Sequence, residues 1–302
     1  MVNTYIHPEP ASWSSQFLQT VMRLIQWKKQ PLTFLTGKRL MQQPAKMPRY
    51  LSQNYNINTT THNGREVYTI TPQKPVSKKV ILYWHGGAYV HNITLFHWNL
   101  VAALVKQTGA TLILPDYPLA PAATWQDVYH FAQTLYQQLL IQTPANQIVF
   151  MGDSAGGGLA LGLTQKLHSE QLPIPPQTIL LAPWLDISMT NPLINQIEPH
   201  DAMLHKQTLL MAANAYANQL PLQDYKVSPL YGSFDGLGTL SVFTGTHDLL
   251  LADARKLKQM AEQQTFALNY FEYPKMFHVW MAITQLPESK HAIQQIARLI
   301  EK

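Results

Sequence analysis

The sequence predicts an α/β protein built on a doubly wound, mostly parallel β-sheet with helices on both faces. From about residue 50 onward, short apolar runs alternate with longer stretches of helical periodicity. Several runs, such as VILYW, TLILP and TILLAP, are continuously apolar, which is typical of strands covered on both faces. Strand and helix patterns that alternate in this way favour a parallel sheet.

The expected elements follow one another without an internal repeat or a low-complexity linker. Strands are expected at residues 67–71, 80–84, 111–115, 147–151, 178–182, 240–244 and 267–273. Helices are expected at about residues 94–107, 125–142, 155–169, 250–264 and 288–301. A more polar, alternating pair at about 53–60 and 66–71 predicts two antiparallel strands at the start of the sheet.

Two regions, residues 1–50 and about 184–235, do not fit this alternation. The second separates two expected strands by far more chain than one helix needs. The first contains a helical stretch whose apolar residues share one face: Trp13, Phe17, Val21, Leu24 and Ile25. Both regions can be read as decoration of the core or as a cap over the active-site end of the sheet, and the pattern alone leaves both open. An amphipathic helix can also lie on a membrane, but one stripe ending near Lys28 and Lys29 supports that weakly.

The composition excludes several classes of chemistry. The chain has 302 residues and no cysteine, so disulfides, cysteine-ligated metals and cysteine nucleophiles are excluded. The net charge of +5 is not gathered in one basic face, which argues against a nucleic-acid partner. The histidines show no metal-ligand spacing, so no metal is expected.

The N-terminus does not have the pattern of a targeting segment. It lacks a cationic start and an apolar core segment, and it carries Pro8 and Pro10. No stretch approaches 18 uninterrupted apolar residues, so no stable membrane insertion is expected. These patterns predict a cytoplasmic protein.

The sequence Gly152-Asp153-Ser154-Ala155-Gly156 follows a buried run and opens a helical pattern. Strand, G-x-S-x-G and helix form the context of a nucleophile elbow, in which a tight turn lifts the serine hydroxyl clear of the sheet. The alternatives are a glycine-rich turn with an idle serine and a phosphate-binding loop. The second is disfavoured because no Gly-Lys-Ser/Thr follows. We therefore take Ser154 as the candidate nucleophile.

A second motif, His85-Gly86-Gly87-Ala88, follows the expected strand at 80–84. Acyl transfer needs backbone N–H donors aimed at the developing oxyanion, and small residues allow the backbone to come close. The expected donors are Gly87, Ala88 and Ala155, with Gly86 as a further candidate. His85 is expected to brace the loop rather than to transfer protons.

The base and its orienting acid are expected after the nucleophile, in the order acid and then histidine. Asp248 and His278 each follow a strand pattern at its carboxyl end, where ligands of open α/β sheets collect. A carboxylate there fixes the imidazole tautomer and stabilises the imidazolium. The competing residues are less well placed in the pattern: Asp253, Glu272, His247 and His291.

Together these motifs resemble the hormone-sensitive-lipase-like family of α/β-hydrolases, in its bacterial carboxylesterase and lipase branch. The resemblance covers roughly residues 66–300. It rests on four motifs in order, His85-Gly86-Gly87, Asp116-Tyr117-Pro118-Leu119-Ala120-Pro121, Gly152-Asp153-Ser154-Ala155-Gly156-Gly157 and Gly245-Thr246-His247-Asp248-Leu249-Leu250-Leu251-Ala252-Asp253. Two departures are Ala88, where a third glycine is usual, and Ala122, where an acidic residue usually follows the proline.

The resemblance implies an α/β-hydrolase fold with an eight-stranded sheet and a helical cap. Residues 1–50 would form the N-terminal part of the cap, and residues 51–302 the catalytic domain with a cap insertion at about 184–235. It also implies a serine esterase without a cofactor that acts on small-molecule esters with short to medium acyl chains. Trp184 and Trp280 are candidate substrate contacts, for which ordinary packing is the alternative.

Other functions remain open on the same fold. A non-catalytic small-molecule receptor could use it, since fold does not dictate function. Among enzymes, a deacetylase or an amidase would use the same Ser154, His278 and Asp248. A homodimer is compatible with the sequence, but no feature requires one.

Overall fold

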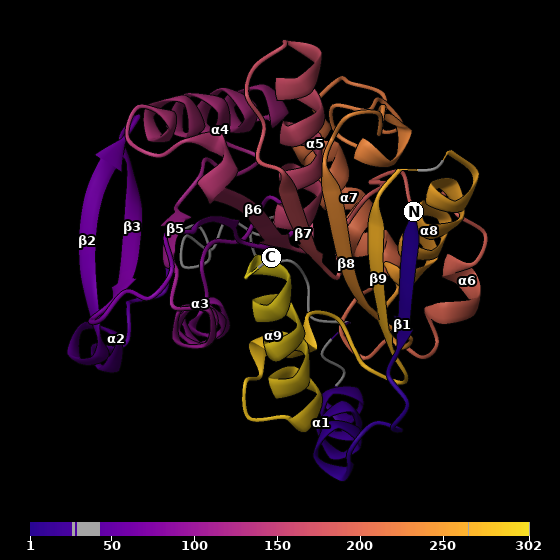
Figure 1. Ribbon diagram of the computed structural model, residues 1–302. Helices are drawn as coiled ribbons and strands as arrows, with labels where there is room; N and C mark the ends of the chain where they lie inside the picture. The colour runs from indigo at the N-terminus through magenta and orange to yellow at the C-terminus, as the bar shows by residue number, and fades with distance from the viewer. Residues whose placement is uncertain (26–27, 29–42, 265, 302) are drawn as a thin grey trace.

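A single nine-stranded sheet organises the protein, with helices packed on both of its faces (Figure 1). The computed structural model describes residues 1–25, 28, 43–264 and 266–301. The strand order is β1-β9-β8-β7-β6-β4-β5-β3-β2. All pairings from β1 to β5 are parallel, and β3 joins both β5 and β2 in antiparallel register. The predicted α/β fold class with a mostly parallel sheet is confirmed.

The strands lie close to the predicted ranges. Their bounds are β1 Val2–Ile6, β2 Tyr55–His62, β3 Arg65–Pro72, β4 Val80–Trp84, β5 Thr111–Pro115, β6 Ile148–Asp153, β7 Gln177–Leu181, β8 Thr239–Gly245 and β9 Leu268–Tyr273. The α-helices are α1 Trp13–Leu24, α2 Arg49–Asn54, α3 Leu95–Thr108, α4 Trp125–Leu140, α5 Ala155–Ser169, α6 Ile194–Ile197, α7 Lys206–Ala217, α8 Leu251–Gln264 and α9 Pro287–Ile300. Short 3₁₀ helices are η4 Ala145–Gln147, η5 Pro229–Tyr231 and η6 Trp280–Ala282. No helix in the described ranges is long and apolar enough to cross a bilayer.

Successive residues of the central strands belong to two different core clusters. In β4, Leu82 and Trp84 pack in one cluster, whereas Ile81 and Tyr83 pack in the other. Helices α4, α5 and α8 contribute to the first cluster, and α3 and α9 to the second. The continuously apolar runs therefore arise because both sides of each strand are covered.

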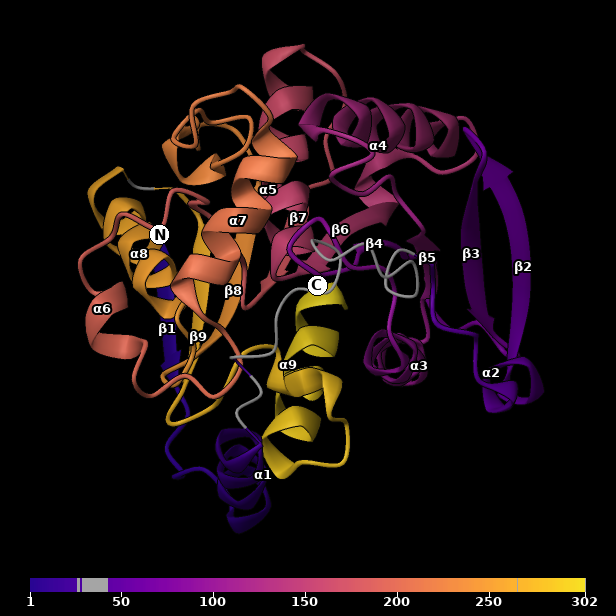
Figure 2. The ribbon, with the colours of Figure 1, turned by 180° about the vertical axis from the view of Figure 1, so that it is seen from behind.

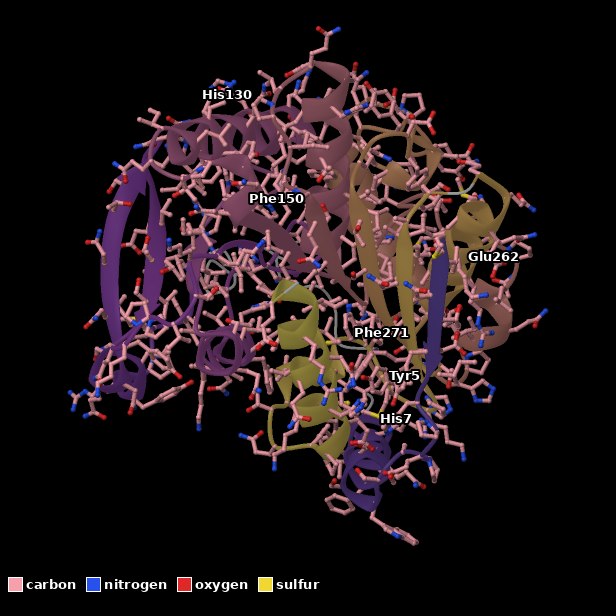
Figure 3. The ribbon with its side chains drawn as sticks, viewed as in Figure 1. Tyr5, His7, His130, Phe150, Glu262 and Phe271 are labelled. Atoms are coloured by element: carbon pink, nitrogen blue, oxygen red, sulfur yellow. The ribbon has the colours of Figure 1, made fainter. Side chains whose placement is uncertain are left out.

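The sheet has one strand more than the eight that the resemblance implied. Strand β1, in the segment expected to belong to the cap, pairs in parallel with β9 at the sheet edge. Figure 3 shows Tyr5 and Phe271 on these neighbouring strands, with ring centroids 5.8 Å apart. The five-residue stretch VNTYI is only partly buried, so it lacks the apolar run that marks the central strands.

Helix α1 matches the expected helical stretch, but its apolar face is turned to solvent. Ser15, Gln19 and Met22 are its buried residues, whereas Trp13 and Phe17 are exposed. The rest of the segment expected to form the N-terminal part of the cap, residues 26–27 and 29–42, lies outside the described residues.

The closest contact between elements is made where α5 passes the end of β4. A Cβ atom at Gly156 would lie 2.0 Å from the carbonyl oxygen of Trp84, and one at Gly152 would lie 2.8 Å from the same oxygen. Only glycine therefore allows strand β6 and helix α5 to sit this close to β4.

We expect Gly156→Ala to destabilise the fold by about 1–3 kcal/mol, because overpacking against backbone atoms outweighs the better helix propensity of alanine. Urea unfolding followed by circular dichroism measures the effect. Gly64→Ala is the matched control, since it adds a methyl group at positive φ with nothing within 4 Å. If Gly156→Ala were more stable than this control, the steric account of the close approach would be wrong.

Candidate active site

Ser154 occupies the turn between β6 and α5 in a backbone conformation that is unusual for a serine. Its φ is 52° and its ψ −120°, a region that L-residues rarely adopt. Neighbouring backbone holds it there. The Ser154 N–H donates to the Leu181 carbonyl at 2.9 Å, and its own carbonyl accepts from Gly158 and Trp184. The side chain therefore stands above the sheet at the carboxyl end of β6.

The structure brings Ser154, His278 and Asp248 into one hydrogen-bonded series. His278 Nε2 lies 2.9 Å from Ser154 Oγ, and His278 Nδ1 lies 2.9 Å from Asp248 Oδ2. Asp248 follows β8 and His278 follows β9, so three strand ends deliver the three groups to one place. With a proton on Nδ1, the imidazole Nε2 is free to accept the serine proton.

The environment of His278 favours its charged form. Burial lowers the pKa of His278, but the charge and hydrogen bond of Asp248 oppose this, together with the charges of Asp201 and Asp153. The net effect raises the pKa above the ordinary value of 6.5. A base of this kind retains a captured proton well during attack on a carbonyl.

Backbone N–H groups lie in the loop after β4 and at the start of α5. Gly87 and Ala88 have φ values of 122° and 54°, so this loop follows an unusual path directly after the strand. In the described part of the chain, no protein acceptor takes the N–H of Gly87, Ala88 or Ala155. These are the three main donors that the sequence predicts.

Gly86, the fourth predicted donor, requires a correction. Its N–H donates to Asp153 Oδ1 at 2.9 Å, which leaves it unavailable to an oxyanion. The sequence analysis assigned Asp153 no role, although it stands next to Ser154. Its carboxylate also accepts the Tyr83 hydroxyl at 2.7 Å, and His97 Nε2 lies 3.4 Å from its other oxygen. Asp153 thus fixes the start of the loop to the elbow.

Asp153 is held as a carboxylate despite its burial. Burial raises the pKa of Asp153, but His97 and the hydrogen bond from Tyr83 bring the net pKa below its usual value. His85 behaves as a bracing residue. Burial and His97 lower the pKa of His85 to about 3, and its ring stacks on Tyr117 at 4.3 Å.

The competing residues are engaged elsewhere. Asp253 accepts from Asn191, and Glu272 pairs with Arg255. His247 hydrogen-bonds to Gln19, and His291 to Tyr273. None of these competitors contacts Ser154. In the described ranges, no three His, Asp or Glu residues are grouped as metal ligands.

The insertion after β7 packs against both halves of the site. Tyr216 of α7 stacks on Tyr89, which follows the donor loop, with ring centroids 3.7 Å apart. Asp201 accepts the Leu249 N–H at 2.7 Å, next to Asp248. Burial and the charge of Asp248 raise the pKa of Asp201 to about 6. No sequence motif pointed to Asp201, because its partners are distant in the chain.

Trp184 and Trp280 are both fully buried. The Trp184 ring donates its Nε1–H to the Met189 sulfur at 3.0 Å, while the Trp184 backbone N–H bonds to Ser154. The Trp280 ring packs on Tyr273 at 4.9 Å and belongs to the core cluster that includes α9. Of the two roles considered for these residues, the contacts describe packing.

Comparison with known proteins agrees with this arrangement. A family model described as alpha/beta hydrolase fold matches residues 81–282. A triacylglycerol lipase from Mycobacterium tuberculosis is 32% identical over 229 residues, which cover 76% of this chain and 48% of that protein. An esterase from Acinetobacter venetianus is 31% identical over 227 residues, covering 72% of this chain and 73% of that protein. The chain thus spans about half the length of the first relative.

A solved structure resembles the whole chain. It is an esterase from the bacterial hormone-sensitive lipase family, with a TM-score of 0.84 and 25% identity, covering 96% of this chain and 98% of that one. The family match includes the donor loop, the elbow and both strand ends that carry Asp248 and His278. The chain belongs to the α/β-hydrolase fold family, in the branch of bacterial hormone-sensitive-lipase-like enzymes.

Proposed function

We propose that this chain is a serine carboxylesterase that hydrolyses esters with short to medium acyl chains. The observation that carries the proposal is the hydrogen-bonded series Asp248–His278–Ser154, with unpaired N–H groups beside it. Relatives named esterase, lipase and acetyl-hydrolase support the reaction class.

In the acylation step, Ser154 Oγ attacks the ester carbonyl while its proton passes to His278 Nε2. The carbonyl oxygen becomes an oxyanion, which accepts hydrogen bonds from the N–H groups of Gly87, Ala88 and Ala155. When the tetrahedral intermediate collapses, the bond to the alcohol oxygen breaks and that oxygen takes the proton from His278. Asp248 keeps the imidazole oriented and stabilises the imidazolium.

In the deacylation step, water attacks the acyl carbon and gives a proton to His278. The same N–H groups hold the second oxyanion. The bond from carbon to Ser154 Oγ then breaks, and Oγ recovers the proton from His278. The carboxylic acid leaves, and the enzyme returns to its starting state without a cofactor.

We further propose that the insertion at about 184–235 forms the cap, together with part of residues 1–50. The stacking of Tyr216 on Tyr89 and the bond from Leu249 to Asp201 support this role, because both link the insertion to the proposed machinery. A receptor without catalysis is the competing function on this fold. An acetyl-hydrolase among the relatives keeps deacetylation as a variant of the same reaction.

Ser154→Ala is expected to abolish covalent labelling by a fluorophosphonate probe and to lower kcat for p-nitrophenyl acetate by about 10³-fold or more. The reason is that no other group lies within reach of His278 as a nucleophile. Ser169→Ala, at the far end of α5, is the matched control. Absence of labelling in the wild type would instead favour the receptor.

Activity is expected to fall as the pH drops through a pKa above 6.5, since protonated His278 cannot accept the serine proton. Asp201→Asn removes one of the charges that raise this pKa, so the midpoint of kcat/KM against pH is expected to move to lower pH. The exposed Asp235→Asn serves as control. An unchanged or higher midpoint in Asp201→Asn would contradict the electrostatic account.

A panel of p-nitrophenyl esters from acetate to palmitate tests the proposed acyl range. We expect kcat/KM to be highest for short or medium chains. A maximum at palmitate would contradict the proposed range while leaving the serine mechanism intact.

A further inference from the structure

We propose that the outer face of helix α1 is a docking surface for an anionic lipid bilayer. This face consists of Trp13, Phe17, Leu24 and Ile25, with the half-buried Val21 between them. The occupant would be the headgroup region of the bilayer, with the helix lying in its plane rather than crossing it.

The apolar side chains of this face are among the most exposed in the described chain. The exposed fractions are 89% for Trp13, 71% for Phe17, 76% for Leu24 and 52% for Ile25. Their spacing of three, four and seven residues places them on one side of a helix. Large side chains grouped in this way usually mark an interaction surface, whereas single exposed ones do not.

The opposite side of α1 is polar, yet it is the side that packs on the protein. Ser15 donates to Glu288 at 2.8 Å. Gln19 contacts His247 at 2.9 Å and donates to the Lys275 carbonyl at 2.8 Å. The helix is therefore held in place by buried hydrogen bonds, so these bonds turn the apolar side outward.

The charge around this helix suits an anionic surface. From residue 10 to residue 65 the sequence has no Asp or Glu and eight basic residues: Arg23, Lys28, Lys29, Lys38, Arg39, Lys46, Arg49 and Arg65. The nearest carboxylate partner of α1, Glu288, is 3% exposed and is bonded to Ser12 and Ser15. Basic residues near an apolar face strengthen attachment to anionic lipids.

The position of α1 relates this surface to the candidate site. Gln19 bonds to the loop after β8, which carries Asp248, and to the loop after β9, which carries His278. Figures 1 and 2 show α1 at one end of the molecule, beside the lower end of α9. A bilayer on α1 would thus lie at the end of the sheet where the strand ends gather. The value of this placement for ester hydrolysis rests on the proposed function, whereas the docking itself does not.

The test is co-sedimentation of the full chain, as Ser154→Ala to prevent hydrolysis, with vesicles. Pure phosphatidylcholine is compared with a mixture of phosphatidylcholine and phosphatidylglycerol. The double variant Trp13→Ser, Phe17→Ser removes two anchors of the face. The matched control is Val76→Ser, Ile141→Ser, whose native side chains are 84% and 82% exposed and precede β4 and β6 at the other end of the sheet.

We expect binding to the anionic vesicles, weakened by salt and reduced about tenfold or more in the Trp13, Phe17 variant but not in the control. Absence of binding, or equal binding by both double variants, would overturn the proposal. Size-exclusion chromatography adds a separate outcome. A wild-type dimer that becomes a monomer in the Trp13, Phe17 variant, without vesicle binding, would assign the face to a second copy. Fluorophosphonate labelling of the wild type tests the proposed function independently.

Discussion

The arrangement of the site depends on how closely helix α5 passes the end of strand β4. Glycines at positions 152 and 156 permit this approach, since a Cβ atom at either would meet the Trp84 carbonyl oxygen. The approach forces the tight turn at Ser154, and it also sets the loop that leaves β4 alongside that turn. One packing contact therefore fixes both the candidate nucleophile and the N–H groups opposite it. Their relative position is inherited from the sheet and does not require a separate loop interaction.

Buried carboxylates then fix the loops that the sheet alone leaves undetermined. Asp153 ties the loop after β4 to the elbow through the Gly86 N–H. Asp201 accepts three backbone N–H groups, from Met203, Leu204 and Leu249, and so joins the insertion to the loop after β8. Because a buried carboxylate is costly unless its oxygens are bonded, each holds its partners in a narrow range of positions.

The sequence was informative where local chemistry decides the outcome. Runs such as VILYW announce strands covered on both sides, and the residue types around Ser154 permit little other than an elbow. It was uninformative where distant partners decide. Strand β1 is short and half-exposed, so its pairing with β9 leaves little trace in its composition. The orientation of α1 depends on Glu288 and His247, more than 200 residues away, which bond the polar side that a helical wheel would assign to solvent. Gly86 was misjudged because the competing acceptor belongs to Asp153, a residue of another motif.

Two carboxylates lie near His278, and their hydrogen bonds explain why they differ in role. Asp248 accepts the Leu250 N–H on one oxygen, so its other oxygen is left to face the imidazole at 2.9 Å. Asp201 spends both oxygens on backbone N–H groups and acts on His278 only through its charge. Burial and the neighbouring Asp248 raise the pKa of Asp201 to about 6, so it carries its charge mainly above that pH. The proposed base is therefore supported by two anions in the pH range where it must be neutral to act. One of them orients the ring, and the other strengthens its hold on the proton without competing for it.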